Sequence, residues 1–161
     1  MIFKAITIKY ASIWQNFELI LLNILLINMR KIEHIGIAVK SLNESNLLFE
    51  KLFGKPPYKQ EVVESEGVKT SFFMNGPNKI ELLEATNAES PIAKFIEKKG
   101  EGIHHIAFDV EDIIQEIKRL KDEGFIVLNE VPKKGADNKM VAFLHPRSTN
   151  WILIELCQEI R

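Results

Sequence analysis

The segment His34-Ile-Gly-Ile-Ala-Val39 returns later in the chain as His105-Ile-Ala-Phe-Asp-Val110. Further along, Lys-Ile-Glu81-Leu-Leu returns as Leu-Ile-Glu155-Leu-Cys. The two histidines are 105 − 34 = 71 residues apart, and the two glutamates are 155 − 81 = 74 residues apart. Because these spacings nearly match, we interpret the chain as one module present twice. Each copy then carries one His and one Glu at equivalent positions.

The first copy, residues 30–86, has the pattern of a strand, a helix and three further strands. Ser41 and Glu44 form a capping box that starts the helix, and Gly54 ends it. The helix is predicted to bury one apolar face, formed by Leu42, Leu47, Leu48, Phe49, Leu52 and Phe53. β-Branched residues, with turn residues between them, predict strands at residues 32–39, 60–63, 69–74 and 79–84.

The second copy, residues 102–158, repeats this order. Asp112 and Gln115 form its capping box, and Gly124 ends its helix. The apolar stripe of this helix contains Ile113, Ile117 and Leu120. The predicted strands are residues 103–110, 125–128, 139–144 and 152–157. Between the two copies, residues 89–99 have the pattern of a linker helix with Pro91 at its first position.

We therefore predict an α+β fold in which two tandem βαβββ modules form one curled, mixed sheet around a metal site. Neither module could bury its sheet face alone. The length of 161 residues, with 46% hydrophobic and 27% charged residues, fits one soluble globular domain. A balance of 21 basic against 22 acidic residues gives no reason to expect a nucleic-acid partner. The single Cys157 excludes an intrachain disulfide and predicts a reducing, cytoplasmic location.

The first 28 residues differ from the rest in composition. Their apolar run, residues 17–27, is shorter than the roughly 20 residues that a membrane helix needs. The strand pattern starts directly after Met29. We expect residues 1–28 to be a dispensable leader or upstream extension, residues 29–161 to form the folded domain, and no membrane partner. A weak membrane anchor or an additional amphipathic helix is the alternative for the leader.

The repeated residues His34, Glu81, His105 and Glu155 are the candidate site. A single strand histidine is usually a packed core residue, but repetition in both modules favours a shared role. Two imidazoles and two carboxylates suit a divalent ion such as Mn²⁺, Co²⁺, Ni²⁺ or Fe²⁺, and Zn²⁺ less exclusively. Four protein ligands would leave two positions for substrate oxygens.

Two neighbouring residues receive supporting roles. Adjacent strand residues point to opposite faces, so His104 is predicted to be structural or to support the site rather than to share the metal with His105. Cys157, two residues after Glu155, is predicted to have a packing role.

From His34 to Glu155 the chain resembles the vicinal oxygen chelate superfamily of paired βαβββ modules. Within it, the chain is most similar to the methylmalonyl-CoA epimerase family. The resemblance lies in Glu81-Leu-Leu-Glu-Ala with Ser90-Pro-Ile-Ala-Lys-Phe, in Gly102-Ile-His-His-Ile-Ala-Phe-Asp-Val, in Phe143-Leu-His-Pro-Arg-Ser-Thr and in Leu153-Ile-Glu-Leu-Cys-Gln158.

By position, this resemblance implies that His34, Glu81, His105 and Glu155 bind one divalent metal ion, namely Co, Mn, Ni or Zn. It implies an isomerase that interconverts the R and S forms of methylmalonyl-CoA, by metal-assisted removal of the C2 proton through an enolate. Glu155 is our candidate catalytic residue. We further expect an acyl-CoA substrate and a homodimer.

The chain departs from the family pattern at two places. Three residues after the turn glycine Gly67, where some epimerases carry a Glu proposed as a base, this chain has Thr70. Asn150-Trp151 stands where the family often has a Gly-Gly pair.

Two other functions are compatible with this fold. Glyoxalase I can use the same ligands, but it commonly has an Arg for glutathione where this chain has Ala38. A non-catalytic ligand-sequestering protein would typically lack the complete ligand set.

Overall fold

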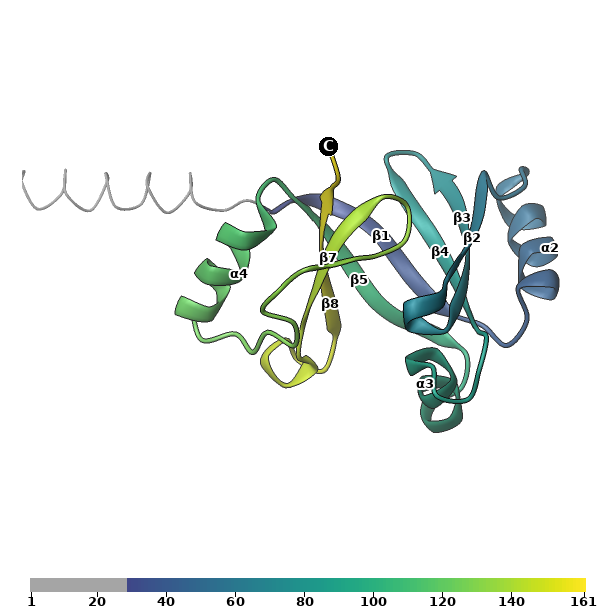
Figure 1. Cartoon of the computed structure of the whole chain (residues 1–161). Helices are drawn as coiled ribbons and strands as arrows, with labels where there is room; N and C mark the ends of the chain where they lie inside the picture. The colour runs from purple at the N-terminus through teal and green to yellow at the C-terminus, as the bar shows by residue number, and fades with distance from the viewer. Residues whose placement is uncertain (1–28) are drawn as a thin grey trace, which may run out of the picture.

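The computed structural model describes residues 29–161 (Figure 1). The expectation that residues 1–28 are dispensable concerns residues outside this part of the chain, and it stays a prediction. Within residues 29–161, no helix is long and apolar enough to cross a membrane.

One eight-stranded sheet organises the described residues, with strand order β2-β3-β4-β1-β5-β8-β7-β6. The strands are β1 (Met29–Ala38), β2 (Lys59–Val63), β3 (Val68–Asn75), β4 (Asn78–Ala85), β5 (Gly102–Val110), β6 (Lys133–Lys134), β7 (Lys139–Leu144) and β8 (Leu153–Glu159). The helices are α2 (Leu42–Phe53), α3 (Pro91–Lys99) and α4 (Ile113–Asp122), with 3-10 turns η1 (Glu64–Glu66) and η2 (Pro146–Ser148).

The sheet has the internal symmetry that the repeat predicts. β1 pairs in parallel with β4, and β5 pairs in parallel with β8. β1 and β5 then pair antiparallel with each other and join the two halves at the centre of the molecule (Figure 1). The predicted α+β fold of two βαβββ modules in one curled, mixed sheet is therefore confirmed.

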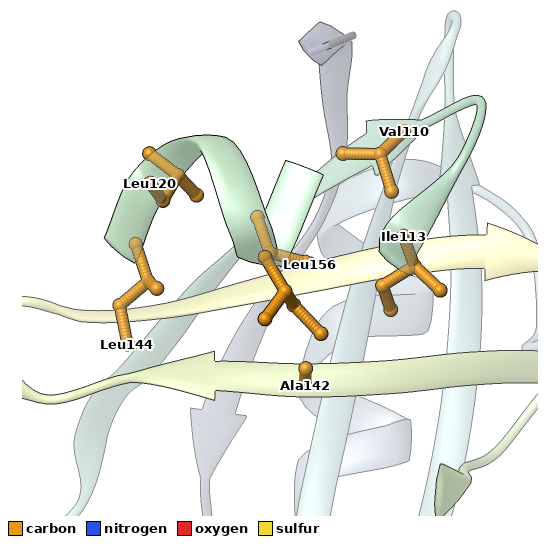
Figure 2. Close-up of a cluster of buried hydrophobic side chains, with 7 residues drawn as sticks. Val110, Ile113, Leu120, Ala142, Leu144 and Leu156 are labelled. Atoms are coloured by element: carbon orange, nitrogen blue, oxygen red, sulfur yellow. The ribbon is translucent and has the colours of Figure 1, made fainter. Parts of the chain in front are cut away.

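Helices α2 and α4 lie at opposite ends of the molecule, each against the outer face of its own module's sheet (Figure 1). On the second module, α4 packs Ile113, Ile117 and Leu120 onto Ala142, Leu144 and Leu156 of β7 and β8 (Figure 2). The contact between α4 and the sheet is mainly apolar. The opposite, inner face of the sheet is therefore free to carry polar residues.

The predicted helix starts are confirmed. Ser41 Oγ accepts from the Glu44 N–H at 3.3 Å, and Asp112 Oδ1 accepts from the N–H groups of Ile114 and Gln115 at 3.0 Å each. The predicted linker helix is α3, with Ser90 as its N-cap and Pro91 in its first turn.

The apolar face predicted for α2 is only partly correct. Leu42 is buried, and Phe49 and Phe53 pack against the sheet, but Leu47, Leu48 and Leu52 are exposed. The reason is geometric, because a single sheet touches only one stripe of a helix and the six apolar residues extend well beyond that stripe.

The strand predicted at residues 125–128 is wrong. Only Val127 forms a bridge there, with Leu144 at the end of β7, while the short strand β6 pairs with Met140 and Val141 in the middle of β7. β7 is six residues long, and these two separate segments share its edge. Neither segment therefore forms a long ladder.

Candidate metal centre

The four predicted site residues come from the four central strands. His34 lies on β1, Glu81 on β4, His105 on β5 and Glu155 on β8. Their neighbours on β4 and β8, such as Leu82 and Leu156, belong to the apolar clusters under α2 and α4. Since side chains alternate along a strand, each glutamate then points to the inner face. This alternation explains why a carboxylate stands between apolar residues in both copies.

All four side chains are buried, with exposed fractions between 4% and 6%, and they converge. His34 Nε2 lies 2.9 Å from His105 Nε2, 3.2 Å from Glu81 Oε2 and 3.8 Å from Glu155 Oε2. His105 Nε2 lies 3.0 Å from Glu155 Oε2 and 3.6 Å from Glu81 Oε2. Two imidazole nitrogens and two carboxylate oxygens therefore meet at one point.

Gly36 makes room for this convergence. It is the register partner of His105, and the His105 ring lies directly over it. A Cβ built at Gly36 would lie 2.5 Å from His105 Nδ1 and 2.6 Å from Nε2, which no real structure permits. The position of the His105 ring thus requires glycine at position 36.

Two β-bulges bring a supporting residue beside each histidine. The register of β1 against β5 shifts at Glu33, between Ile32 and His34, and it shifts again opposite His104, between Gly36 and Ile37. A bulge turns its extra residue out of the normal alternation. Glu33 and His104 therefore line the same cavity as His34 and His105. The prediction that His104 and His105 point to opposite faces is wrong for this reason.

Each bulged residue contacts Nδ1 of the histidine that follows it. Glu33 Oε2 lies 2.6 Å from His34 Nδ1, and Lys79 Nζ lies 2.5 Å from Glu33 Oε1. His104 Nδ1 lies 3.0 Å from His105 Nδ1. Partners of this kind fix the orientation of a histidine and leave its Nε2 directed at the centre. The supporting role expected of His104 agrees with this geometry.

Sequence reasoning missed the role of Glu33. The available signal was the repeat alignment, since Glu33 and His104 both directly precede a histidine of the cluster.

The electrostatics of the cluster follow from its charges. Burial disfavours a charged His34 ring, but Glu81, Glu33 and Glu155 overcome this effect and raise its pKa to about 10. Burial also opposes ionisation of Glu155, yet His105 and His34 lower its pKa to about 2. His104 behaves oppositely, because burial and the neighbouring His105 lower its pKa to about 4 and keep it neutral.

Cys157 contacts the cluster from the side. Its Sγ donates to Glu155 Oε1 at 3.1 Å, which leaves Glu155 Oε2 facing His105. Burial and the Glu155 charge raise the pKa of the Cys157 thiol, so it stays protonated. Cys157 also packs with Ala107, Val141 and Phe143, as the predicted packing role requires.

The cluster opens into a cavity of about 280 Å³ between the two halves of the sheet. Apolar side chains such as Phe72 and Phe143 flank the glutamates, since each is the register partner of one of them. Strand β6 and the loop between it and β7 contribute Lys133, Lys134 and Asp137 to the cavity wall. The cavity is therefore apolar near the cluster and charged along the loop.

The donor set fits a divalent cation. His34, His105 and Glu155 offer ligand atoms within 4.8 Å of one another, and Glu81 Oε2 lies close to both imidazoles. Paired imidazole and carboxylate donors are typical of Mn²⁺, Co²⁺, Ni²⁺ and Zn²⁺ sites. All four groups are buried, and each histidine has a contact at Nδ1 that orients its ring. Both features are typical of metal sites.

The family assignment agrees with this architecture. The model of the glyoxalase/bleomycin resistance protein/dioxygenase superfamily matches residues 33–143. The chain belongs to this superfamily. It is the vicinal oxygen chelate superfamily that the sequence resembles.

Two relatives are similar to this chain along most of their own length. YqjC of Bacillus subtilis (strain 168) is 40% identical over 130 residues, which cover 81% of this chain and 93% of that protein. The ethylmalonyl-CoA/methylmalonyl-CoA epimerase of Cereibacter sphaeroides is 41% identical over 131 residues, covering 80% of this chain and 97% of that enzyme.

A solved structure of an epimerase is also similar to this chain. A variant of Streptomyces coelicolor methylmalonyl-CoA epimerase in complex with 2-nitronate-propionyl-CoA is 32% identical and has a TM-score of 0.78. The alignment covers 81% of this chain and 95% of that one.

Proposed function

We propose that this protein is a metal-dependent methylmalonyl-CoA epimerase. The observation that carries the proposal is the convergence of His34, Glu81, His105 and Glu155 in a buried cavity of a fold whose similar relatives are named as such epimerases. The acyl-CoA substrate is supported by the analogue bound in the similar solved structure. The reaction would be racemisation at C2, the carbon between the thioester and the carboxylate.

The four residues would hold one divalent cation. Bound there, it would supply Lewis-acid chemistry, stabilising the negative charge that builds on the substrate as the C2 proton leaves. Glu33 and His104 would keep the two imidazoles oriented through their Nδ1 atoms. The apolar side chains of Phe72 and Phe143 would exclude water from the reacting carbon, which strengthens electrostatic interactions at the cluster.

Glu155 is the residue that we propose takes the C2 proton from one face of the substrate, and a proton returned to the opposite face of the enolate completes the inversion. Its Oε2 faces the cluster, and its Oε1 is held by the Cys157 thiol. In the resting arrangement the imidazoles keep Glu155 ionised and reduce its affinity for a proton. We propose that Glu155 acts as a general base after Oε2 moves away from His105 Nε2, since the contact with the imidazoles lowers its pKa.

The test is deuterium exchange at C2 of methylmalonyl-CoA in heavy water, beside an assay with the methylglyoxal–glutathione adduct. We expect rapid exchange with metal, loss of exchange on chelation, and no exchange for Glu155→Gln. Glu97→Gln, which changes an exposed glutamate of α3, is the matched control and should exchange like the wild type. Turnover of the adduct without exchange would favour glyoxalase I. Inactivity toward both compounds with metal bound would contradict the epimerase.

A further inference from the structure

Thr70, on β3, carries a hydroxyl that is buried and unpaired. Its exposed fraction is 1%, and among residues 29–161 its Oγ1 has no hydrogen-bond partner. Asn46 Oδ1 and Ser71 Oγ are also unpaired within this part of the chain, but neither residue lines the cavity. Thr70 does line it. Because an unpaired buried hydroxyl is costly, a partner from within the cavity is expected.

The register places Thr70 next to the cluster. Thr70 pairs with Leu83, and Phe72 pairs with Glu81, so Thr70 is a diagonal neighbour of Glu81 on the same face of the sheet. Diagonal neighbours have Cα atoms roughly 7–8 Å apart. A small substrate group between the Thr70 hydroxyl and the four-residue cluster would touch both.

The second module shows that the fold itself does not need this hydroxyl. Val141 is the counterpart of Thr70, because it lies two residues before Phe143 just as Thr70 lies two residues before Phe72. Phe143 pairs with Glu155 as Phe72 pairs with Glu81. Val has nearly the shape of Thr without the hydroxyl, and it packs normally in the second module.

We propose that Thr70 Oγ1 donates a hydrogen bond to an oxygen of the malonyl group of the substrate. This inference rests on the proposed function. The carboxylate and thioester oxygens of that group are acceptors, and a threonine hydroxyl is a donor that stays protonated at neutral pH. Thr70 thus binds the substrate from the β3 wall, and it does not remove the C2 proton.

The experiment compares Thr70→Val, which removes the hydroxyl, with Thr70→Ser, which keeps it. Ser71→Ala is the matched control, because it removes an equally unpaired hydroxyl one residue along, on the opposite face of the strand. We expect kcat/KM for epimerisation to fall about tenfold in Thr70→Val, the effect of one lost hydrogen bond. It should change less than about threefold in Thr70→Ser and in Ser71→Ala.

Thermal stability is the second measurement. Because the hydroxyl has no partner in the described structure, Thr70→Val should melt at or above the temperature of the wild type. An active wild type with unchanged kcat/KM in Thr70→Val would overturn the inference and leave the proposed function standing. A clear drop in melting temperature for Thr70→Val would also overturn it, by revealing a structural partner. An inactive wild type would overturn the proposed function and, with it, this assignment.

Discussion

Glu33 and His104 occupy equivalent positions at the residue scale, each directly before a histidine of the cluster. They differ in chemistry, since Glu33 is ionised and bonded to Lys79, whereas burial keeps His104 neutral. Each nevertheless contacts Nδ1 of its neighbour. The four-residue cluster is therefore symmetric in the placement of its two histidines and asymmetric in the charge of the residues that contact their Nδ1 atoms.

We expect His105→Ala to abolish metal retention and His104→Ala to weaken it much less. The first change removes a proposed ligand, and the second removes only the contact with His105 Nδ1, worth about 10–100-fold in affinity. Metal content after desalting, measured by elemental analysis, checks both. If His104→Ala lost its metal while His105→Ala kept it, the repeat alignment would be wrong.

We expect Gly36→Ala to reduce metal affinity, because its methyl group would collide with the ring of its register partner His105. The ring must then turn away from the cluster or the two central strands must separate, at a cost of about 1–3 kcal/mol in unfolding free energy. Metal titration and denaturant unfolding measure the two effects. Wild-type affinity in this variant would show that the ring is free to move without harm to the site.

Residue identities in the cluster could be predicted from sequence, because the repeat marks His34, Glu81, His105 and Glu155 as equivalent pairs. The two residues that contact the histidines at Nδ1 could not be predicted in the same way. The contacts of Glu33 and His104 depend on two β-bulges, and a bulge is a one-residue shift between strands that the period of a sequence does not record.

At the scale of elements, the central strands and all three helices of the described residues follow the predicted pattern, while the sheet edge does not. The central strands carry apolar residues that pack under the helices, with the repeated polar residues of the cluster between them. Residues 125–128 are apolar as well, but only Val127 bridges to Leu144 at the end of β7, while β6 pairs with the middle of β7. Sequence does not decide which short segment reaches which part of this edge.

Asp137 lies in the segment of residues 132–138, directly before β7. Its contacts hold this segment against the first module. Its carboxylate contacts Lys79 Nζ at 2.6 Å and Lys59 Nζ at 3.1 Å, and it accepts a hydrogen bond from the Tyr58 hydroxyl at 3.3 Å. Its backbone N–H donates to Glu61. The loop also lines the cavity, so the same contacts that hold the loop shape the cavity wall.

We expect Asp137→Ala to raise KM for methylmalonyl-CoA several-fold while kcat changes little. The loop would lose three side-chain contacts, but the cluster would keep its ligands. Because ion pairs near the surface contribute little, unfolding free energy should fall by only about 1 kcal/mol. Steady-state kinetics and denaturant unfolding measure both, with Asp122→Ala, at the exposed end of α4, as control. An equal loss of kcat would place Asp137 in the proton-transfer machinery instead.

At the scale of the whole molecule, the two modules depend on each other through β1 and β5. Each module supplies one His and one Glu, so the cluster exists only when the two halves of the sheet are joined. Residues 29–161 contain an eight-stranded sheet, three helices and the cavity.

We therefore expect a chain that begins at Met29 to fold and to exchange deuterium at C2 as the full chain does. Met29 is the first residue of β1 and pairs with Val110, so this chain keeps the whole strand. Melting temperature and kcat/KM of the two chains provide the comparison. A chain starting at Met29 that aggregates or melts well below the full one would show that residues 1–28 contribute to the fold.

Metal binding should stabilise the whole molecule, because its proposed ligands come from both modules and one ion would tie the two halves together. A ligand that binds only the folded state at 100 times its Kd adds about 2.7 kcal/mol. For a chain of this length, that gain corresponds to a rise in melting temperature of roughly 5–10 °C. Thermal unfolding with and without Mn²⁺, Co²⁺, Ni²⁺ or Zn²⁺ measures it.

The control for this prediction is His105→Ala, which should show no rise with any of these ions, while Glu97→Gln should rise like the wild type. An equal rise in His105→Ala would locate the ion elsewhere on the molecule. A wild type that gains nothing from any ion would mean that the cluster is held by its own hydrogen bonds between imidazole and carboxylate. The thermal shift thus separates a site built for a cation from one that is complete without it, independently of any assay of catalysis.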